Sequence, residues 1–213
     1  EGARVVLIHM EGTRHGKKFF RAMREITRIK PVVVLKTGRT KAGAKAASSH
    51  SASLAGDDQV FDAMLKQSGA IRAEGLEELV DMGKAFCYLP IPHGDGATAI
   101  SLSGGAAVMA ADALEKNGLR IKELRAETLA RVKEKSPPWA NPSNPMDIEP
   151  LTEKIGFSDG YALGLDALLS DGAVDSCIVQ HGSMIRTEEE VRFVFEARER
   201  HPDKPIAVCV LGD

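Results

Sequence analysis

Cysteine and aromatic residues are scarce in this 213-residue sequence, and no long apolar run is present. The three cysteines, Cys87, Cys177 and Cys209, show no CxxC spacing and have apolar neighbours. We therefore expect buried, reduced thiols and a cytoplasmic location. No apolar run approaches the roughly 20 residues that a membrane-spanning helix needs, so we expect no membrane contact.

Basic charge is not in excess either. The net charge is −2 and the isoelectric point is about 6.4, so no broad basic surface for nucleic acid is expected. The sequence also lacks GxGxxG, Walker A and HExxH motifs. No pair of histidines has the spacing of metal ligands, and we predict no metal site in the chain.

Strand-like apolar runs alternate with amphipathic segments along the chain, which predicts parallel sheets covered by helices. We expect two flavodoxin-like domains, residues 1–88 and 94–213, divided by the proline- and glycine-rich stretch Leu89–Gly96. The first copy of the plan is incomplete at its start, and we expect a piece of a longer chain. The predicted strands are 4–10, 31–36, 69–72, 97–102, 119–124, 174–181 and 205–211, and the predicted helices are 16–29, one starting at 57 or 58, 75–85, 108–117, 126–135, 156–169 and 187–200.

The most informative stretch is Arg39–Asp57, which follows the apolar strand Pro31–Leu35 and contains mainly Gly, Ala and Ser around His50. We interpret it as a loop whose small side chains let backbone N–H groups approach an anion. A neutral imidazole nitrogen is a competent nucleophile near neutral pH. Our hypothesis is that His50 is phosphorylated during a reaction. The alternative is a structural or merely exposed histidine.

Glu11 follows the first predicted strand, and the loop with His50 follows the next one. The carboxyl ends of neighbouring parallel strands meet at one sheet edge. A carboxylate there accepts a hydrogen bond from one imidazole nitrogen and leaves the other free to attack. The alternative is a solvent-exposed acid at a strand end.

Ser103-Gly104-Gly105 lies between a predicted strand and a predicted helix. A helix N-terminus offers free N–H groups and partial positive charge, which suit phosphate. The alternative is a plain tight turn. Further along, Asn144-Pro145-Met146-Asp147 is either a loop that fixes Asp147 or only a turn.

Taken together, these motifs resemble the nucleoside-diphosphate-forming acyl-CoA synthetases, which include ADP-forming acetate–CoA ligase and are relatives of succinyl-CoA synthetase. Lys30–His50 looks like the family's phosphohistidine segment, and Gly75–Leu79, Gly104–Glu115 and Asn144–Asp147 follow in the family's order. Two sites depart from the pattern: Ser51-Ala52-Ser53 stands where Thr-Gly-Ala is usual, and Ala106-Ala107 where Pro-Gly is common.

The resemblance implies a carbon–sulfur ligase that couples acyl-CoA cleavage to phosphorylation of a nucleoside diphosphate. By this resemblance His50 takes the phosphoryl group, Glu11 orients it, and Ser103, Gly104 and Gly105 bind phosphate. ATP or ADP with Mg²⁺, and CoA, are implied as substrates bound mainly by CoA-binding and ATP-grasp domains outside this chain. A homo- or hetero-oligomer is implied as well.

Two other functions remain open from the sequence. The same domains fused to an acetyltransferase would form a sensor of acyl-CoA or nucleotide. Alternatively, the chain is a non-catalytic assembly module, because the family's subunits associate through domains of this kind. The presence of both His50 and Glu11 favours the enzyme, because a sensor does not need a nucleophile.

Overall fold

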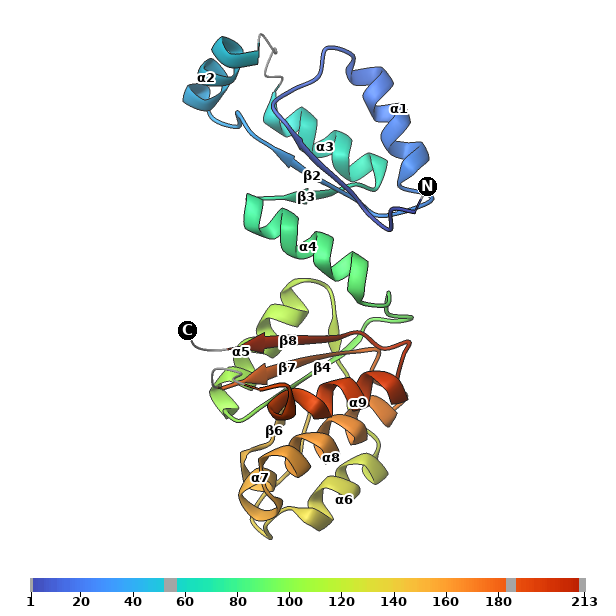
Figure 1. Ribbon diagram of the computed structural model, residues 1–213, viewed down its shortest axis with the longest axis vertical. Helices are drawn as coiled ribbons and strands as arrows, with labels where there is room; N and C mark the ends of the chain where they lie inside the picture. The colour runs from blue at the N-terminus through green and yellow to red at the C-terminus, as the bar shows by residue number, and fades with distance from the viewer. Residues whose placement is uncertain (1, 52–56, 183–186, 211–213) are drawn as a thin grey trace. The chain divides into compact units, whose positions relative to one another are not determined.

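The computed structural model describes residues 2–51, 57–182 and 187–210, apart from the side chains of Ser48, His50 and Ser51. The chain divides into two compact units, Glu1–Leu89 and Pro90–Asp213. Each unit is an α/β structure with its own parallel sheet, and each is described separately below (Figure 1).

The described part of the first unit contains a three-stranded sheet in the order β1-β2-β3. Its strands are β1 (Val6–Met10), β2 (Val32–Lys36) and β3 (Ile71–Ala73), and both pairings are parallel. Every residue of the central strand β2 is buried, as its unbroken apolar run predicts for a strand covered on both faces. Met10 lies opposite Lys36, so β1 and β2 end side by side.

Helices cover both faces of this sheet. Helices α1 (Gly16–Ile26) and α3 (Asp58–Ser68) pack through Met23, Phe61 and Leu65 onto the face of β2 that carries Val32 and Val34. Helix α4 (Leu76–Tyr88) packs through Leu79 onto the opposite face.

Residues 41–51 are helical, so our interpretation of the whole Arg39–Asp57 stretch as a loop is wrong. Helix α2 (Lys41–Ser51) contains six residues of high helix propensity in its first seven positions, and the Thr40 hydroxyl accepts a hydrogen bond from the N–H of Gly43 at 3.1 Å. Small residues serve packing here. Gly38 has φ +72°, and a Cβ on Gly43 would lie 3.3 Å from the Cα of Gly38.

Helix α3 starts at Asp58, which confirms the predicted helix start at residue 57 or 58. Asp57 is its N-cap, and the carboxylate accepts hydrogen bonds from the N–H groups of Gln59 at 2.8 Å and Val60 at 3.2 Å. These bonds satisfy two of the donors that a helix start leaves free. The helix ends at Gly69, which adopts the left-handed conformation with φ +75°.

The described part of the second unit contains a five-stranded parallel sheet in the order β5-β4-β7-β8, with β6 also paired to β4. Helix α5 packs on one face of β4 and β7, whereas α8 and α9 pack on the other. The described elements of the second unit are β4 (Gly96–Ser101), α5 (Gly104–Lys116), β5 (Arg120–Ile121), α6 (Ala126–Lys135), β6 (Met146–Asp147), α7 (Glu149–Ile155), α8 (Phe157–Ser170), β7 (Ser176–His181), the 3₁₀ turn η1 (Glu188–Val191), α9 (Arg192–Arg200) and β8 (Ile206–Val210).

Several predicted boundaries change in this unit. The helix predicted from residue 108 begins at Gly104, because Ser103 caps it and residues 104–107 form its first turn. Helix α7 was not predicted, and the predicted strand 119–124 shortens to β5. The predicted helix 187–200 divides into η1 and α9.

Burial corrects part of the sequence reasoning. Cys177 is buried, Cys87 is half-buried and Cys209 is exposed, so our expectation of three buried thiols holds only for Cys177. Cys209 is exposed because β8 ends the strand order and, among the described strands, pairs only with β7.

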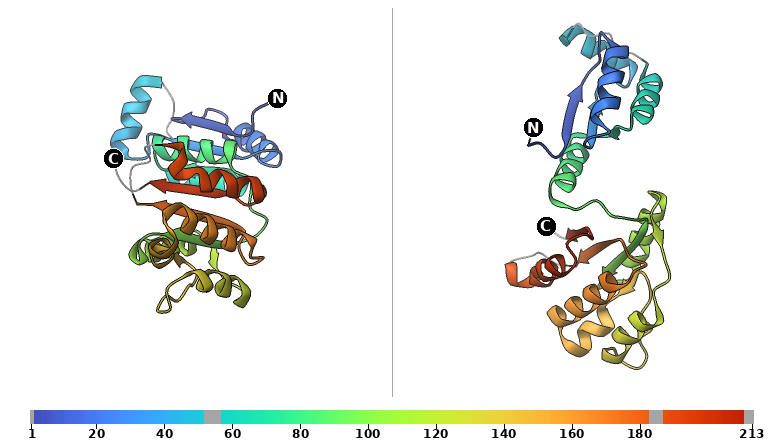
Figure 2. Two further views of the ribbon diagram at one scale, coloured as in Figure 1. Left: turned by 60° about the horizontal axis from the view of Figure 1, so that its bottom comes forward. Right: turned by 90° about the vertical axis from the view of Figure 1, so that its right-hand side faces the viewer.

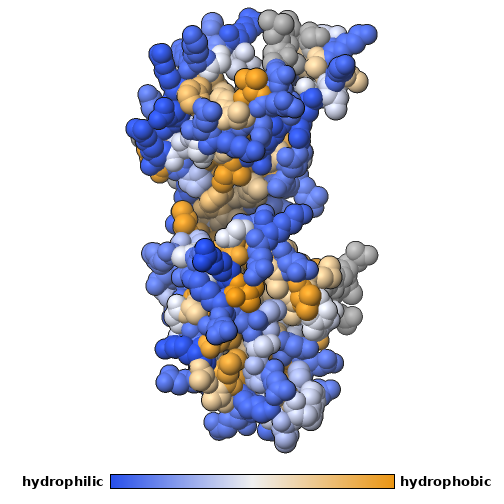
Figure 3. Space-filling model, turned by 180° about the vertical axis from the view of Figure 1, so that it is seen from behind, coloured by the Kyte–Doolittle hydropathy of each residue, from blue (hydrophilic) through white to orange (hydrophobic). Residues whose placement is uncertain are grey.

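The predicted fold class, two parallel-sheet α/β units of flavodoxin type, is confirmed. Figure 2 shows helices flanking each sheet in two further views. Figure 3 shows one face of the surface, on which hydrophilic residues predominate and apolar residues form separate spots. Within the described residues, no helix combines the length and apolar character needed to cross a membrane.

The Gly96→Ala substitution tests the packing at the start of β4. A Cβ on Gly96 would lie 2.0 Å from the carbonyl oxygen of Ala173, which belongs to the backbone. We expect a loss of about 3 kcal/mol in the free energy of unfolding, because the backbone has to move. Chemical denaturation measures this loss.

Gly172→Ala is the matched control, since a Cβ there meets nothing within 4 Å. We expect it to change the free energy of unfolding by less than about 1 kcal/mol. Equal stability of the two variants would contradict the close approach at Gly96.

Candidate functional site

Glu11 and the helix that carries His50 start from one edge of the first sheet. Glu11 directly follows β1, and the N–H of Thr37, directly after β2, donates to the carbonyl of Met10 at 3.0 Å. The sequence predicted that these two strands are neighbours with their carboxyl ends together, and the register of β1 and β2 confirms it. The backbone of His50 lies in the last turn of α2.

The backbone around His50 is helical, which differs from the predicted anion-binding loop. In an α-helix, the N–H groups beyond the first turn bond to carbonyl groups of the same helix. The residues of α2 therefore do not form the anion-binding backbone loop that we expected from their small size. The side chain of His50 lies outside the described atoms, as do Ala52 and Ser53, so its predicted contact with Glu11 stays a prediction.

A cluster of charges lies at the two ends of the segment that contains α2. We call Lys36, Arg39, Asp58 and Arg72 the stem cluster. Nη2 of Arg72 donates to both carboxylate oxygens of Asp58, at 2.7 and 2.9 Å. Nζ of Lys36 and Nε of Arg39 lie 3.7 and 3.5 Å from the same carboxylate. Sequence analysis missed this cluster, because only the fold brings β3 beside the start of α3.

Burial makes these charge pairs stronger than ordinary surface pairs. The side chains of Lys36, Arg72 and Asp58 are 1%, 10% and 27% exposed. Burial alone would raise the pKa of Asp58, but the hydrogen bond from Arg72 and the positive charges of Arg72, Lys36 and Arg39 outweigh it. The pKa of Asp58 therefore lies below its ordinary value, and the carboxylate is ionised at neutral pH.

The second unit offers free N–H groups at the start of α5. The Ser103 hydroxyl accepts from the N–H of Ala106 at 3.4 Å, and the Ser103 carbonyl accepts from the N–H of Ala107 at 2.9 Å. Among the described residues, the N–H groups of Gly104 and Gly105 have no hydrogen-bond partner. Ser103 and Gly105 are exposed, so an anion can approach these donors from solvent.

Asp147 lies beside this helix start. β6 pairs Asp147 with Ser101 at the end of β4, and a Cβ on Gly104 would lie 3.0 Å from Oδ2 of Asp147. Glycine is therefore the residue that leaves this carboxylate room. The carboxylate also sets a negative charge next to the donors, so an anion bound there has to avoid it. The sequence singled out Asp147 but gave no reason to place it against α5.

Asn144 fixes the loop that leads to Asp147. Its side-chain amide donates to the carbonyls of Lys122 at 2.9 Å and Ala97 at 3.3 Å, and its oxygen accepts from the hydroxyl of Thr98 at 2.6 Å. Of the two interpretations of this motif, the structure supports a loop that fixes Asp147 over a simple turn.

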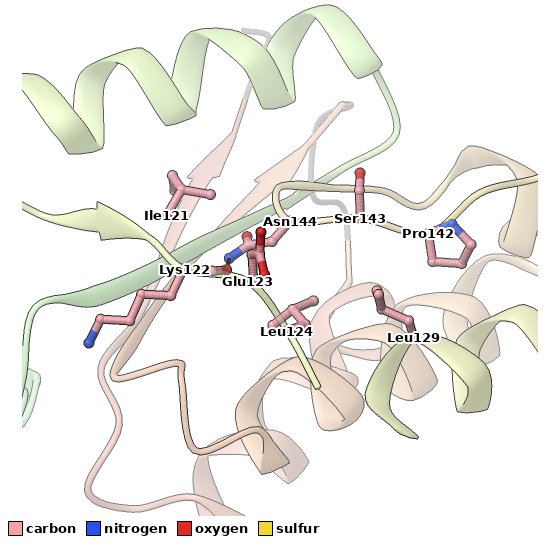
Figure 4. A pocket seen from close by; sticks show the side chains of 8 residues that line it. All are labelled: Ile121, Lys122, Glu123, Leu124, Leu129, Pro142, Ser143 and Asn144. Carbon is pink, nitrogen blue, oxygen red and sulfur yellow. Dashed lines mark hydrogen bonds between the residues drawn. The ribbon is translucent and has the colours of Figure 1, made fainter. Parts of the chain in front are cut away.

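Asn144 also lines a pocket of about 310 Å³ (Figure 4). The end of β5, the segment after it, helix α6 and the proline-rich loop line this pocket, through Ile121, Lys122, Glu123, Leu124, Leu129, Pro142, Ser143 and Asn144. Asn144 bonds near the start of β4, whereas Ser103 follows its end. At about 3.3 Å per residue, Ala97 and Ser101 are about 13 Å apart along β4, so this pocket is separate from the helix start.

The other histidines divide between core and surface. His181, at the end of β7, is 1% exposed and packs edge-on against Phe157, so it belongs to the core. His9, at the end of β1, is exposed. In the described ranges, no group of three or more His, Cys, Asp or Glu side chains is arranged to hold a metal ion.

These geometries define a class: two parallel α/β units with polar groups at the carboxyl ends of their strands. Residues 1–86 match the family described as the succinyl-CoA ligase like flavodoxin domain, and residues 97–213 match the Ligase-CoA domain. The chain therefore belongs to the succinyl-CoA ligase-like family, as the resemblance in its sequence predicted.

Named relatives share the whole length of the chain. It is 37% identical to acetate–CoA ligase [ADP-forming] II of Archaeoglobus fulgidus, and the match covers 100% of the chain and 31% of that protein. It is 36% identical to acetate–CoA ligase [ADP-forming] I subunit alpha of Pyrococcus furiosus, with coverage of 100% and 46%. The chain thus spans about a third to a half of the length of these relatives.

A solved structure agrees with this assignment. The dinucleotide-forming acetyl-coenzyme A synthetase 1 of Ca. Korarchaeum cryptofilum, in complex with phosphate and ADP, superposes with a TM-score of 0.85 at 30% identity. The superposition covers 98% of this chain and 45% of that one.

The Asn144→Ala substitution tests the anchoring of the loop before Asp147. It removes three hydrogen bonds and leaves the hydroxyl of Thr98, which is fully buried, without its acceptor. We expect a loss of about 2–3 kcal/mol in the free energy of unfolding, measured by chemical denaturation.

Asn141→Ala is the control in the same loop, because Asn141 is exposed. We expect it to change the free energy of unfolding by less than about 0.5 kcal/mol. An Asn144 variant as stable as this control would contradict the anchoring role.

Proposed function

We propose that this chain is the phosphoryl-carrying part of an ADP-forming acyl-CoA synthetase. The complete enzyme would interconvert acyl-CoA, ADP and phosphate with a carboxylic acid, CoA and ATP. The first unit, residues 1–88, would carry the phosphohistidine at His50. The second, residues 94–213, would supply a phosphate-binding helix start.

The observation that carries this proposal is the similarity along the whole chain, at 36–37% identity, to two proteins named as ADP-forming acetate–CoA ligases. The structure supports it at two sheet edges. Glu11 and the segment leading to His50 follow neighbouring strand ends, and α5 offers the free N–H groups of Gly104 and Gly105.

The proposed step moves one phosphoryl group in two displacements. An acyl phosphate first forms when an oxygen of phosphate attacks the thioester carbonyl of acyl-CoA, the C–S bond breaks and CoA leaves. A neutral nitrogen of His50 then attacks the phosphorus of this acyl phosphate, the bond from phosphorus to the acyl oxygen breaks, and the carboxylate leaves. Glu11 holds the proton on the other imidazole nitrogen. A terminal oxygen of ADP then attacks the same phosphorus, the N–P bond breaks, and ATP and neutral His50 result.

The second unit would hold charge during this transfer. The N–H groups of Gly104 and Gly105, with the Ser103 hydroxyl, donate to phosphate oxygens at the positive end of the α5 dipole. We propose that CoA, the nucleotide and its Mg²⁺ are bound mainly by CoA-binding and ATP-grasp domains or subunits outside these residues, in a homo- or hetero-oligomer in the cytoplasm.

Labelling tests the role of His50. We expect the complete protein, incubated with Mg²⁺ and ATP radiolabelled in its terminal phosphate, to take up label that is acid-labile and base-stable, as a phosphohistidine is. We expect His50→Ala to take up none, because the nucleophile is missing. Gel autoradiography after acid and base treatment measures the label.

His9→Ala is the matched control, because His9 lies at the end of β1 on the same sheet edge. It should keep the label. A folded, complete wild-type protein without label would reject the enzyme and leave the sensor or the assembly module. Label that survives in His50→Ala but not in His9→Ala would show that His9, and not His50, carries the phosphoryl group.

Glu11→Gln tests the orienting carboxylate. The substitution keeps the size of the side chain but removes its charge, so the proton on the distal nitrogen of His50 is held less firmly. We expect phosphohistidine formation to slow by about 100-fold, the range of one positioned acid–base group. Rapid-quench measurement of the labelled protein gives the rate constant.

Glu25→Gln removes the same charge from an exposed position on α1 and should leave the rate unchanged. If Glu11→Gln reacts as fast as this control, Glu11 does not orient His50.

A further inference from the structure

The segment that contains α2 leaves the first sheet at one point and returns to it at another, and the stem cluster joins the two. Lys36 is the last residue of β2, and Arg39 lies between β2 and α2. Asp58 is the first residue of α3, where the chain returns. Lys36 and Arg39 approach the Asp58 carboxylate at 3.7 and 3.5 Å, so the exit and the return meet at a single carboxylate.

Arg72 ties this meeting point to the sheet itself. It lies in β3 opposite Val34 of β2, and its Nη2 bonds to both oxygens of Asp58. Its Nη1 lies 3.4 Å from Asp62, and its buried Nε has no hydrogen-bond partner among the described atoms. Asp58 is therefore the main counter-charge of a cation that is 10% exposed, and its loss would leave that charge poorly compensated.

Arg39 adds a second attachment. Besides approaching Asp58, its guanidinium pairs with the carboxylate of Glu74, which directly follows β3. The connection before α2 is thus held to the ends of β2 and β3 and to the start of α3. The other groups that face Asp58 are cations, which keeps the arrangement intact at neutral pH.

We propose that Asp58 is a positioning residue that holds both ends of the α2 segment at the carboxyl edge of the sheet, and so fixes where His50 meets the phosphoryl group. This role rests on the proposed function of His50. A misplacement of about 1 Å between reacting groups costs up to about 100-fold in rate, so a fixed stem matters even though it does not touch the reacting atoms.

Hydrogen exchange tests the clamp without any chemistry. In the complete protein, Asp58→Asn should speed amide exchange in residues 41–51 by about tenfold, because the stem loses the charge that joins its ends. Asp62→Asn is the matched control. Asp62 lies one turn later in α3 and contacts Arg72 and Lys66, but neither Lys36 nor Arg39. We expect less than about a twofold change there.

Single-turnover labelling then tests the positioning role. If Asp58 positions His50, Asp58→Asn should lower the rate constant of phosphohistidine formation by about tenfold, while the labelled fraction at completion stays that of the wild type. Asp58→Glu, which keeps the charge, should recover part of the rate. A purely structural role predicts the opposite pattern, a smaller labelled fraction that forms at the wild-type rate.

Arg39→Met keeps the test decisive if Asp58→Asn does not fold. Arg39 is 38% exposed, and its loss removes only the attachment on the α2 side. The proposal is overturned if Asp58→Asn has the same amide exchange rates and the same rate constant of phosphohistidine formation as Asp62→Asn. If Asp58→Asn does not fold, the same comparison is made with Arg39→Met. A wild-type protein that takes no label contradicts the proposed function instead, and the exchange comparison alone then decides whether the clamp exists.

Discussion

The parallel pairing of β1 with β2 is the constraint on which the first candidate site depends. Because Met10 lies opposite Lys36, the two strands end together, and the residues that follow them share one sheet edge. Glu11 follows one strand directly, and the stem cluster and α2 follow the other. A slip of one residue would exchange the two faces of β2, so Val32 and Val34 would face α4 and the packing on both faces would have to change.

Local signals explain most of what the sequence predicted correctly. The strand Val32–Lys36 and the start of α3 at Asp58 each depend on neighbouring residues, and those residues are visible in the sequence. The family resemblance depended on the order of several motifs along the chain, and this order can be seen in a single sequence. These predictions succeeded because local propensity and tertiary packing agree at these places.

Most of the failures have tertiary causes, but the failure at α2 is local. Lys41–Ser51 contains Gly and Ser as well as Ala, so composition alone did not choose between loop and helix; Thr40 capping and the close approach of Gly38 and Gly43 accompany the helix. The stem cluster joins Asp58 to Arg72, which only the β2–β3 pairing brings near. Asp147 reaches Gly104 through the pairing of β6 with β4. Cys209 is exposed because of its place in the strand order, which its apolar neighbours do not reveal.

The two units place charged and polar groups at their strand ends in different ways. In the first, three cations surround one ionised carboxylate, and Glu74 and Asp62 beside the cluster pair with Arg39 and Arg72 and offset the remaining positive charge. In the second, neutral N–H donors of α5 stand beside the carboxylate of Asp147, so an incoming anion meets both attraction and repulsion. A site that must release a phosphoryl group as readily as it receives one benefits from this balance, because very tight binding of the anion would slow the next transfer. In the proposed phosphate site, the carboxylate next to Gly104 would therefore favour transient over permanent binding of the anion.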